Sequence, residues 1–169
     1  MTTQMPATAP AASQAADQTA AAREYLTFRL GAEEYALDIL KVQEIRNYEA
    51  ATAIANAPKH IRGVVNLRGV IVPIVDLRML LGLANAEYTA FTVVIVLNLG
   101  RRTVGVVVDA VSDVTELAAE QIRPAPDFSG AVDTDYVLGL GTVENRMLIL
   151  ADIERLLAGE RAELVPSLH

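Results

Sequence analysis

A valine- and isoleucine-rich run, residues 61–78, constrains the fold more than any other part of the chain. Its two apolar segments meet at Arg68-Gly69, and this pattern predicts a β-hairpin. Pro73 lies in the second segment and cannot donate a backbone hydrogen bond, so we expect that strand to lie at a sheet edge or to be bulged. Asp76 then provides a good N-cap for a short apolar helix over residues 77–81.

The same unit occurs a second time along the chain. A shift of 76 positions (61 to 137, 82 to 158) lays residues 137–158 on residues 61–82 without a gap, and it places the second hairpin turn at Glu144-Asn145. A shift of 69 positions (31 to 100) aligns the earlier parts of the two halves. Matching turns, caps and strand patterns in one order indicate a duplicated β module. The matched residues include Gly63 with Gly139 and Asp76 with Asp152.

The domain organisation follows from this repeat. Residues 1–22 are rich in Ala, Thr, Gln and Pro and lack the basic start of a signal peptide, so we interpret them as a disordered tail. We predict one folded domain over residues 23–158, with halves at about 23–83 and 90–158, and a loose tail over residues 159–169. Each half has only about 60–70 residues, too few for a large core, so we expect the halves to share an interface and fold together.

The composition narrows the class of protein. Although 52% of the residues are hydrophobic, no apolar run approaches the roughly 20 residues of a membrane span. The lack of Cys excludes a disulfide scaffold and thiolate chemistry, and with the missing signal peptide it favours the cytoplasm. The net charge of -7 argues against nucleic acid, because phosphates are bound by basic surfaces. Proteins are therefore the expected partners.

The remaining patterns predict a mainly β fold. Residues 25–31 and 35–39 read as a second hairpin, and the almost continuously apolar residues 91–99 predict a strand that is buried on both faces. Residues 40–46 fit a helical turn or a bent strand, and we favour an extended segment. Short strands, frequent turns and a few brief helices, including one over residues 151–157 at the C-terminal end, indicate small antiparallel barrels.

The search for catalytic chemistry finds little. The chain has two His residues, of which one is the last residue and the other, His60, is better explained as a solvated side chain than as a catalytic base. The Gly139-Leu-Gly141 pair lacks the third glycine of a dinucleotide loop. We predict no catalytic residue and no cofactor. We also predict no metal site, because the closest acidic cluster has too few carboxylates for a hard cation. That cluster is Asp109, Asp113 and Glu116.

Five residues are ambiguous from pattern alone. Arg68 at a hairpin tip and Glu44 each read as solvated, but together they would indicate a binding surface if the fold brought them close, because a carboxylate can orient a guanidinium toward a partner. Val42 and Val114 read as core residues. Phe128 follows a rigid proline-containing loop, where it is a candidate anchor for a partner protein.

Five motifs stand out, at residues 41–46, 61–78, 107–114, 121–126 and 146–150. Taken together they resemble the CheW family of bacterial chemotaxis coupling proteins, and the resemblance covers about residues 24–157. It implies two packed five-stranded barrels of the Src-homology-3-like type, with short helices and no catalysis. The same module occurs in the regulatory domain of the histidine kinase CheA and in CheV.

The resemblance also implies partners and contact residues. The expected partners are the cytoplasmic tip of a methyl-accepting chemotaxis receptor and the regulatory domain of CheA, with other CheW copies as a further candidate. The protein would be cytoplasmic and recruited to receptor arrays, with no insertion into the membrane. The implied receptor-binding residues are Ile39, Val42, Glu44, Arg68 and Val114, and the implied CheA-binding residues are Arg123 and Phe128.

Two alternatives remain open at this stage. A CheW-like protein of a non-chemotactic pathway, such as twitching motility or second-messenger control, would share the fold. A small ligand-binding barrel or enzyme belongs to a different class and would require a polar cleft.

Overall fold

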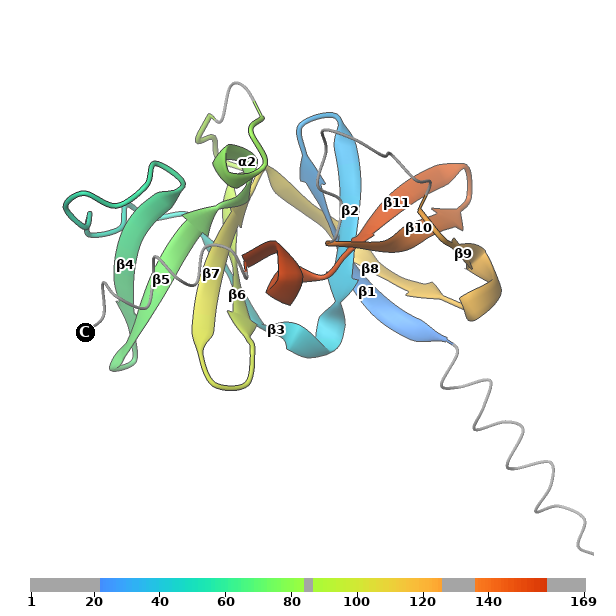
Figure 1. Cartoon of the computed structure of the whole chain (residues 1–169), viewed down its shortest axis with the longest axis horizontal. Coiled ribbons are helices and arrows are strands. Elements are labelled where there is room, and N and C mark those ends of the chain that lie inside the picture. Colours follow the sequence, from blue (N-terminus) through green and yellow to red (C-terminus); the bar gives the residue numbers. More distant parts are fainter. Residues whose placement is uncertain (1–21, 84–86, 126–135, 158–169) are drawn as a thin grey trace, which may run out of the picture.

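The computed structural model describes residues 22–83, 87–125 and 136–157, which form two β-sheets side by side (Figure 1). The sheet of the first barrel has five strands, in the order β3-β6-β7-β5-β4, and that of the second barrel has six, in the order β8-β1-β2-β11-β10-β9. The first-barrel strands are β3 (Val42–Asn47), β6 (Val93–Asn98), β7 (Thr103–Val108), β5 (Val70–Asp76) and β4 (Ile61–Leu67). The second-barrel strands are β8 (Ala110–Leu117), β1 (Arg23–Leu30), β2 (Glu33–Asp38), β11 (Arg146–Ala151), β10 (Val137–Val143) and β9 (Ile122–Arg123).

Helices are short. Two 3-10 turns, η1 (Ile39–Lys41) and η2 (Ala119–Gln121), and one α-helical turn, α2 (Leu77–Leu80), connect strands, and residues 153–157 are also helical. Asp76 caps α2 by accepting from the backbone N–H of Arg78, as the sequence predicts. Within the described residues, no helix has the length and apolar character of a membrane span.

The two halves of the sequence exchange strands. The hairpin β1–β2 from the first half lies in the second barrel, and the hairpin β6–β7 from the second half lies in the first barrel. Each barrel is completed by a short parallel ladder, β5 with β7 and β11 with β2. A half by itself therefore lacks two strands of the barrel that its own central hairpin builds.

The pairings repeat between the barrels in the register that the sequence shifts predict. Gly63 pairs with Ile74 across a bulge in β4, and Gly139 pairs with Leu150 across a bulge in β10. The backbone N–H groups of the two helix-capping residues also have equivalent partners. Asp76 N donates to His60 O at 2.7 Å, and Asp152 N donates to Tyr136 O at 2.7 Å. The duplication seen in the sequence is thus present in the hydrogen bonding.

Alternating residues of the central strands face two different cores. In β6, Ile95 and Leu97 belong to a cluster between the barrels, whereas Val94 and Val96 belong to the first barrel's own core. The prediction of a strand buried on both faces is therefore confirmed for residues 94–97, whereas Phe91, at the start of the predicted run, precedes the strand and is 74% exposed. The second barrel has a third, smaller cluster around Leu148. The cluster between the barrels contains more buried residues than either of the other two clusters, so the two barrels fold around a shared apolar interface.

The central hairpin has the predicted turn but a different position in the sheet. Both turn residues have positive φ, 52° at Arg68 and 90° at Gly69, which is the geometry of a tight two-residue hairpin turn. The strand that contains Pro73 is an inner strand, so the expected edge position is wrong, and the bulge lies in β4. Proline is tolerated there because the ladder from β5 to β7 begins only at Ile74.

The segment after β3 closes the first barrel against β4. Thr52 and Val64 exchange two backbone hydrogen bonds of 2.9 Å each. A Cβ atom on the neighbouring Gly63, whose φ is +135°, would lie 2.1 Å from Thr52 O. Only glycine allows this approach.

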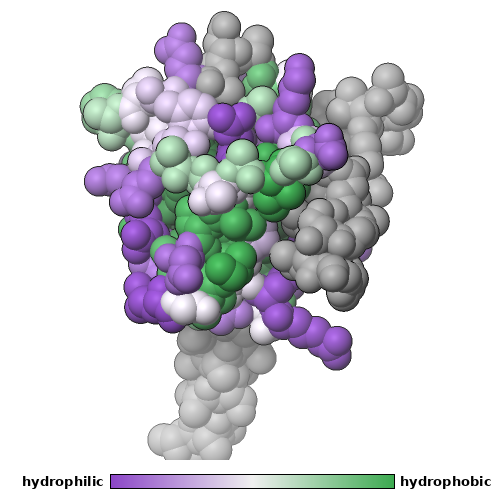
Figure 2. Space-filling view, turned by 90° about the vertical axis from the view of Figure 1, so that its left-hand side faces the viewer, coloured by the Kyte–Doolittle hydropathy of each residue, from purple (hydrophilic) through white to green (hydrophobic). Residues whose placement is uncertain are grey.

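The outer end of the first barrel carries an apolar area surrounded by charged residues (Figure 2). The exposed apolar residues of its β4–β5 hairpin are Val70 and Ile71, which keep 52% and 53% of their surface accessible. Exposed apolar side chains of this kind suit contact with another protein.

Candidate partner-binding surface

The structure brings Glu44 and Arg68 together. Glu44 lies in β3, and Arg68 at the tip of the β4–β5 hairpin reaches it, with Nη2 donating a hydrogen bond to Oε2. The side chain of Arg68 remains 66% exposed, while that of Glu44 is 24% exposed. Arg46 Nη1 lies 3.5 Å from the other carboxylate oxygen of Glu44. A carboxylate held between two guanidinium groups therefore orients an exposed arginine.

Electrostatics keep this pair charged. The hydrogen bond from Arg68 lowers the pKa of Glu44 below its ordinary value and outweighs the opposing effect of desolvation. Glu44 is therefore ionised at neutral pH, and Arg68 presents a fixed set of N–H donors at the surface.

The apolar residues predicted beside this pair differ in exposure. Val114 in β8 is 52% exposed, so its interpretation as a core residue is wrong. Ile39 and Val42 are half-buried and pack against the cluster between the barrels, so part of their role is structural. The expected extended segment is found from Val42 onward, after the 3-10 turn η1.

Two exposed apolar residues close to Glu44 in the sequence were not singled out from the sequence. Leu40 in η1 is 86% exposed and Ile45 in β3 is 43% exposed. The repeat could have indicated Ile45. The shift of 69 positions (45 to 114) places it on Val114, which the family resemblance implies as a receptor contact.

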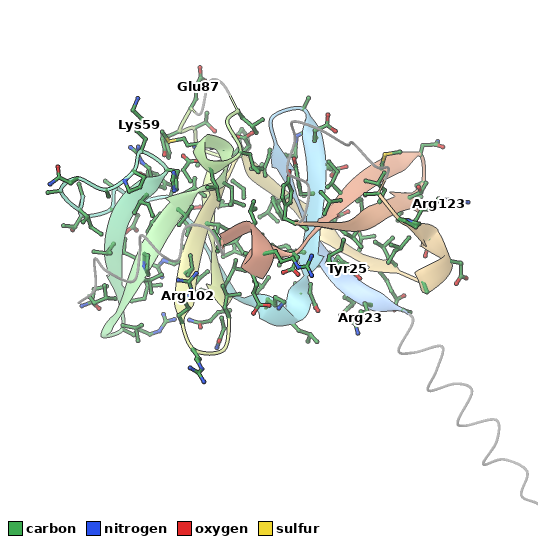
Figure 3. All side chains as sticks on the ribbon, viewed as in Figure 1. Arg23, Tyr25, Lys59, Glu87, Arg102 and Arg123 are labelled. Atoms are coloured by element: carbon green, nitrogen blue, oxygen red, sulfur yellow. The ribbon has the colours of Figure 1, made fainter. Side chains whose placement is uncertain are left out.

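The residues assigned to CheA binding lie elsewhere. Arg123 is exposed on β9, at the outer end of the second barrel away from the first (Figure 3). Phe128 lies outside the described residues. The structure therefore separates Arg123 from the hairpin that carries Arg68.

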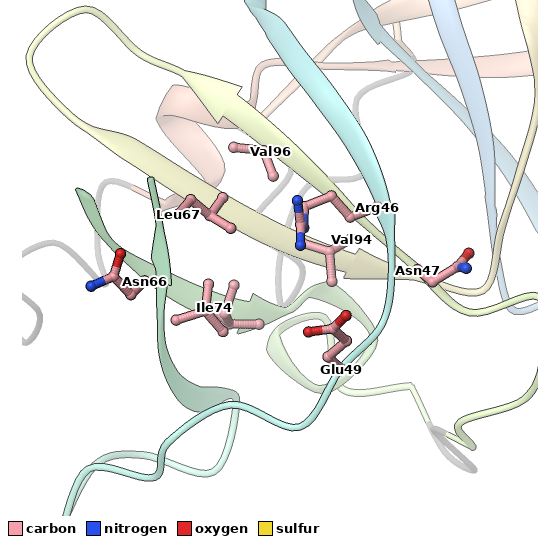
Figure 4. A pocket seen from close by; sticks show the side chains of 9 residues that line it. Arg46, Asn47, Glu49, Asn66, Leu67, Ile74, Val94 and Val96 are labelled. Carbon is pink, nitrogen blue, oxygen red and sulfur yellow. The ribbon is translucent and has the colours of Figure 1, made fainter. Parts of the chain in front are cut away.

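A small pocket opens between β3 and β4, the two outer strands of the first barrel's sheet (Figure 4). Ile74, Val94 and Val96 form its apolar floor, and Arg46 and Glu49 are among its polar lining residues. Its volume of about 60 Å³ is well below the roughly 300–1,000 Å³ of ordinary small-molecule sites. A space of this size is too small for an ordinary small-molecule ligand.

A buried ionic network, which the sequence did not indicate, lies behind α2. Arg78 is 1% exposed and donates from Nε and Nη2 to the two oxygens of Asp76, each at 2.9 Å. Its Nη1 donates to Asp109 Oδ1 at 2.7 Å. Asp109 Oδ2 in turn accepts from Gly31 N of the second barrel at 2.7 Å. The network thus joins the two barrels at the crossover from β7 to β8.

The network also fixes the ionisation of Asp76. Burial by itself would raise the pKa of this carboxyl group, but hydrogen bonds from Arg78 and Tyr88 lower it below the ordinary value. The pair is enclosed, so its role is structural rather than that of a surface for partners.

The described residues contain no group of three His, Cys, Asp or Glu side chains that could hold a metal ion. Two strand-exchanged barrels, with an oriented ion pair and exposed apolar side chains on their outer faces, define a two-barrel β protein whose surface suits contact with other proteins.

Comparison with known proteins identifies the family. The CheW-like domain family matches residues 24–161. The chemotaxis protein CheW of Klebsiella aerogenes is 59% identical over 143 residues, which cover 85% of this chain and 86% of that protein. The probable chemotaxis protein CheW of Rhizobium etli is 38% identical over 141 residues, covering 83% of this chain and 91% of that protein.

A solved structure supports the same family assignment. The crystal structure of the scaffolding protein TtCheW from Thermoanaerobacter tengcongensis matches with a TM-score of 0.74 and 30% identity, covering 80% of this chain and 92% of that chain. The chain belongs to the CheW family of chemotaxis scaffolding proteins.

Proposed function

We propose that this protein couples the cytoplasmic tip of a methyl-accepting chemotaxis receptor to the regulatory domain of the histidine kinase CheA in receptor arrays, without catalysis of its own. The observation that carries this proposal is the exposed Glu44–Arg68 pair, which is fixed in orientation yet accessible to a partner.

The geometry suits a helical partner. A receptor tip is a helical hairpin, and a helix laid on a surface is held by apolar contacts and a few oriented charges. Arg68 supplies the charge, and Val114 supplies exposed apolar surface. Ile39 and Val42 are half-buried, so they contribute contact area while also supporting the interface between the barrels.

The kinase contact is assigned to a separate surface. Arg123 lies at the outer end of the second barrel, where binding of a kinase domain leaves the Arg68 hairpin of the first barrel accessible. Phe128 is retained as the second kinase-contacting residue of this proposal. Simultaneous binding of both partners is what a coupling protein requires.

Separate binding measurements test this assignment. We expect Arg68→Ala and Val114→Asp to weaken binding of a purified receptor cytoplasmic fragment, because both side chains are exposed, and to leave CheA binding unchanged. Arg123→Ala should have the opposite pattern. Thermal unfolding checks that each variant is folded. Equal loss of both partners in any of these variants would count against two distinct surfaces.

A further inference from the structure

Because the sequence is duplicated, the surroundings of the helical turn α2 in the first barrel can be compared with the equivalent region of the second barrel. In the first barrel, Tyr88 packs beside α2. Its hydroxyl donates to Asp76 Oδ2 at 2.5 Å. Its ring centroid lies 4.8 Å from the guanidinium carbon of Arg78 and 5.5 Å from that of Arg62. The tyrosine is thus held by a carboxylate at its tip and by cations against its ring.

Among the described residues, the corresponding place in the second barrel is left as a pocket. The shift of 76 takes three residues around Tyr88 to their second-barrel counterparts, which all line one pocket of about 250 Å³. Tyr25 and Lys41 also line this pocket, and Figure 3 shows Tyr25 near the middle of the molecule. The three pairs are Asp76 with Asp152, Arg62 with Leu138, and Arg78 with Glu154.

The carboxylate in the open pocket has capacity for a further donor. Asp152 Oδ1 accepts from Arg155 N at 3.2 Å, which caps the helical segment. Its Oδ2 lies 3.8 Å from Arg155 Nε, longer than a hydrogen bond. Asp76, by contrast, receives two side-chain N–H groups of Arg78 and the hydroxyl of Tyr88. A carboxylate can accept several hydrogen bonds, so Asp152 can take an incoming hydroxyl.

One further wall of the pocket suits an aromatic ring. Leu138 is 57% exposed and replaces the cation Arg62 with an apolar surface. Glu154 replaces Arg78 and is paired with Lys41 at 3.0 Å. The pocket therefore offers an apolar wall beside an acceptor carboxylate.

This chain does not contain a spare tyrosine for the pocket. Its five tyrosines are Tyr25, Tyr35, Tyr48, Tyr88 and Tyr136, and all lie among the described residues. A tyrosine that fills the pocket must therefore come from another molecule.

We propose that the pocket between Leu138, Asp152 and Glu154 binds a tyrosine side chain of a partner protein, with the hydroxyl donating to Asp152 and the ring lying against Leu138. Tyr88 in the first barrel is the template for this contact. The pocket shares no residue with the proposed receptor and kinase surfaces, so it is a third site and does not depend on those assignments.

Nuclear magnetic resonance on the full chain tests the proposal with N-acetyl-tyrosinamide and N-acetyl-phenylalaninamide. We expect the tyrosine compound to shift the amide signals of Leu138 and Asp152. The phenylalanine compound should bind about tenfold more weakly, because it cannot donate to the carboxylate. Asp152→Asn, which keeps a good helix cap, should reduce this preference. Glu120→Gln, an exposed carboxylate outside the pocket, is the matched control.

A gain of affinity provides the second arm. Glu154→Arg restores the guanidinium that packs on the ring in the first barrel, and we expect it to tighten tyrosine binding by about threefold or more. Misfolding could not produce that result. Absence of shifts at the pocket, equal affinity for the two compounds, or a tyrosine preference that survives Asp152→Asn would overturn the proposal.

Discussion

Replacement of Arg78 by methionine should destabilise the protein strongly. Arg78 and Asp76 are 1% and 0% exposed, and the arginine supplies two N–H donors to that carboxylate and one to Asp109. Methionine has similar length but leaves a buried carboxylate without its counter-ion. Breaking one side of a buried ion pair costs about 3–5 kcal/mol, and we expect Arg78→Met to lower the free energy of unfolding by that amount.

The duplication provides a matched control for this measurement. Glu154 occupies the repeat position of Arg78 and forms its own ion pair with Lys41. These side chains are 50% and 33% exposed, so Glu154→Ala should cost less than about 1 kcal/mol. Urea unfolding followed by circular dichroism at pH 7 measures both. A cost for Arg78→Met as small as that of Glu154→Ala would refute the reasoning.

Acid provides an independent check of the same network. The folded-state pKa of Asp76 is lowered, so this group contributes stability above its unfolded-state pKa of about 3.9, and that contribution is lost as the pH falls through the lower folded value. In Arg78→Met the buried carboxyl group of Asp76 has no counter-ion, so its folded-state pKa is raised, and protonation removes the cost of the buried charge. As the pH falls, the difference in stability between the two proteins should therefore begin to narrow above about pH 4, where the carboxyl group of the variant takes up its proton, and should narrow further below about pH 4, where the unmodified protein loses its contribution.

Three further outcomes follow from the fold. Gly63→Ala should lower the free energy of unfolding by more than about 2 kcal/mol, because its Cβ would lie 2.1 Å from a carbonyl oxygen. Gly69→Ala, which has a positive φ but open space around it, should lower it by about 1 kcal/mol. Urea unfolding of both variants compares the two values. Burial raises the pKa of Tyr35 to about 12, so stability from this group should be lost between pH 10 and about 12, and ultraviolet absorbance should show its late ionisation. Residues 23–83 alone should give no cooperative thermal transition, since β1 and β2 belong to the other half's barrel.

Local features of the fold were predictable because their determinants lie close in sequence. The hairpin around Arg68-Gly69 and the N-cap at Asp76 depend on turn and capping chemistry within a few residues. The matching pairings of the two halves follow from the repeat. The exchange of hairpins between the barrels was not predictable, because each strand has the same apolar pattern whichever barrel it joins.

The candidate site shows the same division. Glu44 and Arg68 are separated by 24 positions, and only the fold shows that they meet. Val114 and Val42 have the same apolar character in the sequence, yet one is exposed and the other packs against the cluster between the barrels. Arg78 looks like a solvated helix residue from its neighbours. Its burial depends on Asp109 and Tyr88, which reach it from other elements.

ATP turnover by CheA in the presence of a receptor cytoplasmic fragment tests the coupling role most directly. We predict that the protein stimulates turnover in the three-component mixture and that Arg68→Ala greatly reduces the stimulation. Arg101→Ala, which removes an exposed arginine from the β6–β7 turn of the same barrel, should behave like the unmodified protein. A mixture in which the unmodified protein gives no stimulation, or in which Arg68→Ala stimulates as well as Arg101→Ala, would contradict the account.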